Sequence, residues 1–530
     1  MGHEAILRNF NVARGQAQST PALEPAEFPG LGYLMGPPQP WQRSRWGNDS
    51  GAARGVLTRL LRALPELADW PCPLKSGIGL DDNPFIPSGY TYLMQFVVRD
   101  LAPTGSKLAQ GAANGIGAGD SHAGGMMLEA LYGGGQYGSP AAGGPTKVSP
   151  GAGGGSPTPR LSRVAGPRNG ADPHNGDKSR KDDGRPRNDD DPILAQFVAL
   201  FSLAHNIIAE QVEPVRPEAR FVYARAVMLA IYHDIIRDDL LPRLLHPAVW
   251  RAMNERHATS ATWLWQQSGL PLEFSHSAFR ASHAAVRPGC GQGNRPGEQD
   301  VTARHASGGG AEEATRAPSQ AEWLAQWSRL FSLGAAPDYS RRISPTRASL
   351  EFRDLLPDAG DEGDGVAFRD LLGAAAAHPW SVDAMIATIM ERAPDLIPAG
   401  WMFADPARRR SIIAQWLTKV CSPASGLTEE DIEALADDPP LPLFILLEAG
   451  VDRVMGGRCL GVLGSVIVGE VIFKRLAGQR DRLEMLRTAA QTALPAELAA
   501  AVAGIDSMPG LVMFVARFAG MGEVGGVPFT

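Results

Sequence analysis

The stretch LEFSHSAFRASHAAVRP, Leu272–Pro288, concentrates side chains that could do chemistry. His276 and His283 lie seven positions apart and so fall on one face of a helix. Imidazoles are common metal ligands, and Arg280 lies one turn before His283, where its guanidinium could meet an acidic group. A histidine on a helix is nevertheless more often a packed core residue than a ligand. This stretch alone therefore does not identify a function.

The same stretch is expected to form a helix of roughly four to five turns. Phe274, Ala278, Ala281 and Ala285 recur at steps of three and four residues, and Pro288 ends the pattern. Small side chains dominate the helix, so a large flat group has room to lie against its surface. They are Ser275, Ser277, Ala278, Ala281, Ser282, Ala284 and Ala285.

The bulk composition excludes one class of partner. The chain has 530 residues, of which 44% are apolar and 20% charged, as is ordinary for a globular protein. Its formal net charge is −7 and its pI is near 5.9. A nucleic-acid surface needs a basic excess, so no nucleic-acid partner is expected.

Cysteine usage and apolar runs suggest the compartment. The four cysteines, Cys72, Cys290, Cys421 and Cys459, are widely separated and show neither zinc-site nor disulfide spacing. The N-terminal residues lack the apolar core of a signal peptide. The most apolar run, Leu460–Phe473, is too short to span a bilayer. We therefore expect a soluble cytoplasmic protein without a transmembrane segment.

Composition also divides the chain. An N-terminal extension is predicted over residues 1–80, a large domain over 81–520 and a short tail over 521–530. Within the domain, residues from about 102 to 185 and from about 288 to 320 are rich in Gly, Pro and polar side chains. Such segments bury too little apolar area to offset their ordering entropy, so we expect disordered insertions.

Between these insertions the patterns are helical, so the fold class is expected to be mainly α. Apolar stripes run through Pro192–Val212 and Arg220–Leu245, and nearly all of the C-terminal third is helical. Thr428 with Asp431 three positions later predicts a capping box at the start of one of these helices. The segment from Asp81 is expected to begin as a Pro/Gly loop and to become helical near Tyr92.

Three separated motifs form one ordered pattern. The first is QFVVRD at Gln95–Asp100, which follows NPFIPSGYTYL. The second is RNDD at Arg187–Asp190, which precedes a helix, and the third is the stretch with His283. In this order they resemble the animal-type haem peroxidase superfamily, the peroxidase–cyclooxygenase group, and in particular its bacterial members. The corresponding family patterns are I-P-A-G-Y-T-Y-x-x-Q-F-x-x-H-D, R-N-D-E and F-x-x-x-A-Y-R-x-G-H-x-x-V-R. The resemblance runs from about residue 83 to 520 outside the insertions.

The resemblance implies a mainly helical domain with a haem between a distal and a proximal helix. His283 matches the proximal iron ligand, and Arg280 is positioned to meet a haem propionate. The alternatives are a core histidine and a surface arginine. Where the family has Asn in F-R-N-L-L, this chain has Asp370 in FRDLL. A carboxylate there would increase the imidazolate character of His283 and lower the iron potential. Alternatively, Asp370 pairs with Arg369 or another cation on a solvated turn.

The distal pattern departs from the family. Peroxide cleavage needs a base, which the family supplies from the histidine of Q-F-x-x-H-D. Arg99 stands at that position, and a guanidinium stays protonated at ordinary pH. Arg187 matches the distal arginine that stabilises the departing hydroxide, and Gln95 matches the glutamine near the iron. His122, in the glycine-rich insertion, is an alternative base.

The resemblance also bears on cofactors. The family acids that esterify the haem fall at Val98, which cannot form an ester, and Asp190, which can. We therefore expect haem b without double covalent attachment. A calcium site is doubtful: Asp100 matches, but Met127 stands where an acid is usual, with Glu129 nearby. Calcium prefers six to eight oxygen ligands, including several carboxylates.

The leading hypothesis is a haem-binding, peroxidase-like oxidoreductase that acts on a peroxide or hydroperoxide and an unknown electron donor or organic substrate. A second hypothesis is a catalytically inactive relative that uses the helical domain as an interaction scaffold. A third is haem binding for sensing or storage without turnover. A visible spectrum and one peroxide assay would separate the three.

Overall fold

The computed structural model describes thirteen stretches of the chain. They are residues 31–47, 51–64, 82–101, 126–132, 192–212, 217–259, 262–267, 269–286, 327–334, 336–345, 366–420, 426–452 and 454–518. The two predicted insertions lie almost entirely outside them, apart from the segment at 126–132.

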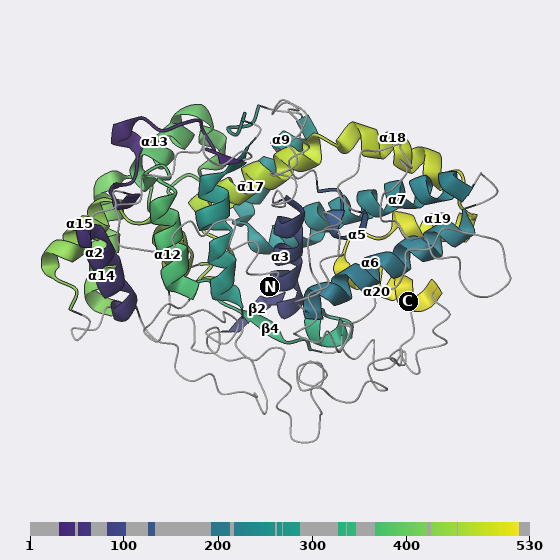
Figure 1. The fold of residues 1–530 in the computed structure, drawn as a ribbon, viewed down its shortest axis with the longest axis horizontal. Helices are drawn as coiled ribbons and strands as arrows, with labels where there is room; N and C mark the ends of the chain where they lie inside the picture. Colours follow the sequence, from purple (N-terminus) through teal and green to yellow (C-terminus); the bar gives the residue numbers. More distant parts are fainter. Residues whose placement is uncertain are drawn as a thin grey trace, which may run out of the picture.

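The described residues are mainly helical, which confirms the predicted fold class (Figure 1). The first helices are α2 (Gly51–Ala63), α3 (Ser88–Leu101), α5 (Glu129–Tyr132), α6 (Pro192–Gln211), α7 (Pro217–Asp234), α8 (Leu241–Leu244) and α9 (Pro247–Thr259). Those that follow are α12 (Val366–Ala376), α13 (Val382–Arg392), α14 (Pro406–Val420), α15 (Glu429–Asp437), α16 (Leu441–Val451), α17 (Val462–Ala477), α18 (Arg480–Gln491), α19 (Ala496–Ala503) and α20 (Met508–Phe518).

Short 3-10 and π segments and four strands complete the described elements. The short helical segments are η2 (Pro40–Gln42), η3 (Arg45–Gly47), η4 (Ile235–Leu240), η5 (Phe274–Ala278), η6 (Arg280–Ala285) and η8 (Pro394–Leu396). The strands are β1 (Leu31–Gly32), β2 (Asp82–Pro87), β3 (Leu270–Pro271) and β4 (Tyr339–Arg341). β1 pairs in parallel with β3, and β2 pairs antiparallel with β4.

The region expected to be a loop before Tyr92 is instead a strand followed at once by a helix. β2 occupies Asp82–Pro87, and α3 begins at Ser88. The Pro-rich sequence gives no local strand signal because the partner strand β4 lies about 250 residues later. Gly89 is required at this junction, because a Cβ there would come within 2.5 Å of the Leu330 carbonyl oxygen.

The stretch that contains His283 is helical but not a regular α-helix. It opens with one π segment, η5, and tightens after Phe279 into the 3-10 segment η6. A similar π segment, η4, interrupts the predicted helix over Arg220–Leu245. Irregular helical turns of this kind occur often at functional sites.

Figure 1 shows α3 near the middle of the molecule, with α6, α7, α18 and α20 on one side. On the other side α2 lies beside α14 and α15, although these helices are far apart in the sequence. Arg59 of α2 donates Nε and Nη2 to Asp431 of α15 at 2.8 and 2.7 Å. No helix within the described ranges has the length and apolar character needed to cross a membrane.

Part of the predicted N-terminal extension packs into the main core. Tyr33 and Leu34 are buried within it. The carboxylate of Glu273, directly before η5, accepts the backbone N–H groups of Leu34 and Trp380 at 3.0 and 3.3 Å. Three distant segments therefore meet at the start of the His283 stretch. The domain boundaries remain sequence-based predictions.

Candidate functional site

His283 lies on η6, and its side chain retains 12% of its exposed area. Its Nδ1 lies 2.7 Å from Oδ2 of Asp370, which comes from α12. Because a carboxylate can only accept, Nδ1 donates this hydrogen bond, and in the neutral form of the ring the lone pair then lies on Nε2. That nitrogen is the one through which such a ring coordinates a metal. The structure thus joins the two proximal residues that the sequence suggested.

Asp370 is buried rather than located on a solvated turn, so that alternative is wrong. Besides His283, it accepts from Nη1 of Arg280 at 2.9 Å. Burial alone would raise the pKa of Asp370, but His283 and Arg280 together outweigh it and hold the pKa below its ordinary value. The carboxylate is therefore ionised and able to polarise the imidazole.

Arg280 is not a surface arginine, because only 8% of it is exposed. In addition to Asp370, it contacts the carbonyl oxygen of Ser275 through Nε at 3.3 Å. The sequence pointed to a propionate, whereas the observed partner is the Asp370 carboxylate. Contact between Arg280 and a propionate stays a prediction.

The predicted distal residues Gln95 and Arg99 lie on α3. Together with Thr91 they are spaced by four positions and form one stripe of the helix. Gln95 is partly buried and Arg99 is buried. Helix α3 is in contact with η6, so the stripe and His283 belong to neighbouring elements.

Three other predicted distal residues lie outside the described residues. They are Arg187, Asp190 and His122. Val98, at the position of a haem-esterifying acid in the family, is buried in the apolar core.

Asp100, the residue that matches a calcium ligand, holds backbone in this structure. Its Oδ2 accepts the N–H of Leu128 at 3.0 Å. Nearby, Nε2 of His233 lies 2.9 Å from the carbonyl oxygen of Met126. These contacts fix a short segment in which Met126 and Leu128 both have φ of 52°. Within the described ranges, no group of three or more His, Cys, Asp or Glu side chains could hold a metal ion.

Two residues beside the site were not identified as functional from the sequence. Thr91 precedes Gln95 by one turn, and Ser282 directly precedes His283. Both hydroxyl groups are buried and have no hydrogen-bond partner in the described structure. The sequence signal that could have identified them is a small polar side chain close to a predicted site residue: Thr91 lies one turn before Gln95, and Ser282 lies one position before His283.

The residues predicted to lie on the proximal side have the chemistry that a haem ligand requires. His283 has its Nδ1 bound to an ionised carboxylate, which orients the ring and leaves Nε2 as the basic nitrogen. Buried Ala278, Ala281 and Ala285 offer little bulk along the same helical stretch. A histidine imidazole oriented by a carboxylate is a usual axial ligand of a haem iron.

Residues 159–309 match the model of the animal haem peroxidase family. This match confirms the predicted resemblance to that superfamily. The matched segment covers less than half of the 530 residues and includes both Arg280 and His283.

Among solved structures, the chain is similar to peroxidase A from Dictyostelium discoideum, with 16% sequence identity and a TM-score of 0.34. The similarity covers 62% of this chain and 58% of that one, so this chain spans little more than half of that peroxidase. No curated protein matches the chain.

Proposed function

We propose that this protein is a haem-binding, peroxidase-like oxidoreductase that acts on a peroxide or hydroperoxide. His283 would hold the haem iron, with Nε2 as the coordinating nitrogen. The observation that carries the proposal is the 2.7 Å contact between His283 Nδ1 and Asp370 Oδ2. A carboxylate bound to the second ring nitrogen is the arrangement that orients metal-binding histidines.

The bound haem supplies the redox chemistry that reduces the peroxide. Asp370 accepts a hydrogen bond from Nδ1–H, which would make the imidazole a stronger donor to the iron and lower the iron potential. Arg280 keeps Asp370 ionised through its 2.9 Å contact and is proposed to bind a propionate as well. On the proposed proximal side, Arg280 is therefore bound to Asp370, and Asp370 is bound to the ring nitrogen of His283 opposite the metal-binding one.

On the distal side, Gln95 and Arg187 bind the peroxide, and Arg187 stabilises the negative charge on the departing hydroxide. Arg99 cannot take up the peroxide proton, since its guanidinium is already protonated. Loss of that general base slows hydrogen peroxide turnover by a factor on the order of 10²–10⁴. Two cationic residues favour an anionic ligand or an acidic hydroperoxide, which needs less help with its proton.

The proposed cofactor is haem b without double covalent attachment, because Val98 cannot form an ester and only Asp190 could. Calcium is not proposed, since Asp100 binds the backbone of Leu128. The electron donor or organic substrate is a separate small molecule that the residues at the site do not identify.

The test is a visible spectrum of the purified protein and of two variants. A Soret band is expected in the wild type and should vanish in His283→Ala. His257→Gln should keep the band, because His257 is a buried histidine that packs against Phe473 and is not matched to an iron ligand. Far-UV circular dichroism checks that each variant is folded.

Other outcomes would select other functions. A folded but colourless wild type would overturn haem binding and favour an inactive scaffold. A Soret band that depends on His283, with no oxidation of any donor by peroxide, would favour sensing or storage.

A further inference from the structure

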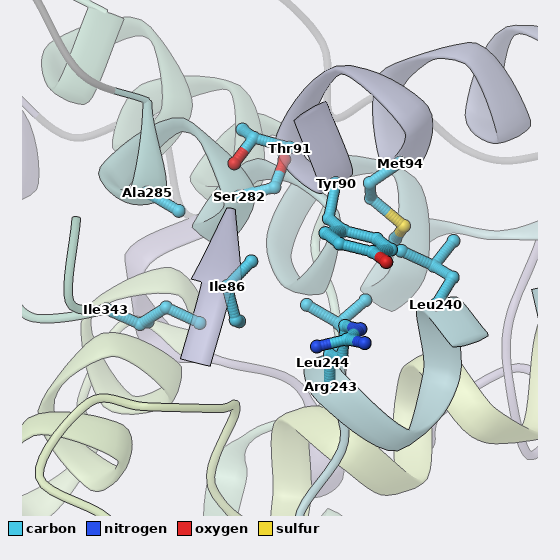
Figure 2. A pocket seen from close by; sticks show the side chains of 10 residues that line it. All are labelled: Ile86, Tyr90, Thr91, Met94, Leu240, Arg243, Leu244, Ser282, Ala285 and Ile343. Atoms are coloured by element: carbon cyan, nitrogen blue, oxygen red, sulfur yellow. The ribbon is translucent and has the colours of Figure 1, made fainter. Parts of the chain in front are cut away.

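Helix α3 forms one wall of the space beside η6. Figure 2 shows Thr91 and Met94 of α3 and Ser282 of η6 around this space, which belongs to the proposed haem site. The helix ends at Leu101, two residues after the predicted distal residue Arg99. The contacts that fix this end of α3 therefore also position Arg99.

Two buried side chains, one of them at this end of α3, bind the backbone of the short segment 126–132. Oδ2 of Asp100 accepts the N–H of Leu128 at 3.0 Å. Nε2 of His233, near the end of α7, lies 2.9 Å from the carbonyl oxygen of Met126. A carbonyl oxygen can only accept, so Nε2 donates this hydrogen bond. We call these two hydrogen bonds the clasp.

The clasp maintains a backbone conformation that residues other than glycine rarely adopt. Met126 and Leu128 both have φ of 52°, in the left-handed region that favours glycine. A residue stays in such a conformation only where its surroundings impose it. The clasp binds the carbonyl group of the first residue and the N–H group of the second, so it acts directly on the strained backbone.

Further contacts bury the segment among α3, α6 and α7. Figure 1 shows α5, which forms its second half, close to these three helices. Met126, Leu128 and Leu131 belong to the main core. The Tyr132 hydroxyl lies 2.9 Å from Nδ1 of His205 on α6. The segment is thus part of the domain interior, and its position affects the helices around it.

The family resemblance gives Asp100 as a calcium ligand, but the contacts in the described part of the chain do not suit a cation. Calcium prefers six to eight oxygen ligands, including several carboxylates. Oδ2 of Asp100 faces the positive end of one N–H dipole, and the Met126 carbonyl oxygen faces that of His233. Met127 stands where the family has an acid. Oxygen atoms that would coordinate a cation are thus used for hydrogen bonds.

We propose that the clasp takes the place of a calcium ion, so that the 126–132 segment and the end of α3 are held in position without a metal. Asp100 and His233 are then positioning residues, since they act on Arg99 through the helix and do not touch a substrate. The proposal concerns the scaffold and does not rest on haem binding.

The first experiment measures how the stability of the wild type depends on calcium. Thermal unfolding of the purified full-length protein, followed by circular dichroism, should give the same Tm in excess EDTA as in excess calcium chloride. Elemental analysis by mass spectrometry should find far less than one calcium ion per chain. A Tm that falls in EDTA, or one tightly bound calcium ion per chain, would overturn the proposal.

Variants at His233 test the clasp itself. His233→Leu removes the N–H donor and should lower Tm by a few degrees, because the Met126 carbonyl oxygen loses its partner. It should also speed hydrogen–deuterium exchange in the peptide that contains residues 126–132, and calcium should reverse neither effect. His233→Gln, which keeps an N–H donor, should lie closer to the wild type.

His246→Leu is the matched control, because this partly buried histidine binds Ala248 and Ser465 instead. It should leave exchange in the 126–132 peptide unchanged. Wild-type exchange of that peptide in a folded His233→Leu variant would contradict the proposal.

A variant at Asp100 separates hydrogen bonding from ion binding, and it decides the question even if His233→Leu does not fold. Asp100→Asn keeps an oxygen that accepts the Leu128 N–H but loses the negative charge that a calcium ligand needs. The 126–132 peptide should exchange at close to the wild-type rate, in EDTA as in calcium. Exchange that is fast in EDTA and slow in calcium would show an ion at this place and overturn the proposal. None of these measurements uses the Soret band, so their failure is distinct from failure of haem binding.

Discussion

Asp370 links His283 to Arg280 through two hydrogen bonds. Its carboxylate accepts from the His283 imidazole at 2.7 Å and from the Arg280 guanidinium at 2.9 Å. Each group determines the state of the next. Arg280 and His283 together keep the buried carboxylate ionised against the cost of desolvation, and the carboxylate fixes the imidazole tautomer. An amide at residue 370 could accept the same proton but could not carry the charge that polarises the ring.

The distal departure from the family is also a matter of one residue. Arg99→His should raise hydrogen peroxide turnover by a factor on the order of 10²–10⁴, because an imidazole can take the proton that a guanidinium cannot. Steady-state oxidation of a one-electron donor measures the effect, with the Soret absorbance reporting equal haem content.

Arg99→Gln is the matched control, since it removes the positive charge without adding a base, and it should not reach the histidine variant. If Arg99→His bound haem fully and turnover did not rise, Arg99 would not occupy the position of the general base.

At the scale of elements, local patterns predicted most of the helices well. The predicted capping box at Thr428 is present, with the side chain accepting from the N–H of Asp431 and the Asp431 carboxylate accepting from the N–H of Thr428. Caps and periodic apolar stripes are encoded within a few adjacent residues, so a single sequence reveals them.

Elements that depend on distant partners were predicted poorly. Strand β2 forms because β4 pairs with it, and the residues near Asp82 give no indication of that distant partner. The π and 3-10 turns around Phe279 were likewise not predicted from the local apolar period, and the π segment η5 contacts the distant helices α12, α16 and α17. The contact of Arg280 with Asp370 was not foreseen for the same reason, because Asp370 reaches Arg280 only through the tertiary fold.

The capping box gives a prediction about one element. Thr428→Ala should lower the free energy of unfolding by about 1 kcal/mol, because the Asp431 N–H loses its acceptor. Urea denaturation followed by circular dichroism measures it. Thr418→Ala, at an exposed threonine inside α14, should lower the free energy of unfolding much less. An equal loss in both variants would contradict a stabilising role of the cap.

At the scale of the whole molecule, buried carboxyl groups connect distant segments. Glu273 binds Leu34 and Trp380, Glu448 accepts the N–H of Leu463 at the start of α17, and Glu470 accepts the N–H groups of Leu264 and Trp265. Burial raises the pKa of Glu273 and of Glu470 to about 7 and that of Glu448 to about 8, outweighing these N–H groups.

These shifts predict how stability varies with pH. Between about pH 4.5 and pH 8 the unfolded chain loses protons that the folded chain still holds at these groups. Below about pH 6.5 the buried His205, His233 and His276 oppose this effect, because burial lowers their pKa values to about 3 or 4 and the unfolded chain then holds protons that these rings do not. Above about pH 6.5 the folded state binds more protons at the three carboxyl groups, so stability falls as pH rises to about 8. The urea midpoint should be higher at about pH 6.5 than at about pH 8, and Glu448→Gln should reduce the difference.

Glu430→Gln, at an exposed position of α15, should leave the pH dependence unchanged. A wild-type midpoint that stays constant or rises over this pH range would contradict the prediction, as would a Glu448→Gln variant with the full wild-type slope.

The long sequence separation between His283 and its partner has a consequence for biosynthesis. Asp370 follows His283 by 87 residues, and Trp380 follows Glu273 by 107. While the ribosome is still translating the segment between them, the emerging histidine has no acceptor for its Nδ1 proton. The hydrogen bond that orients His283 can therefore form only after Asp370 has been synthesised, and the contact of Glu273 with Trp380 forms later still.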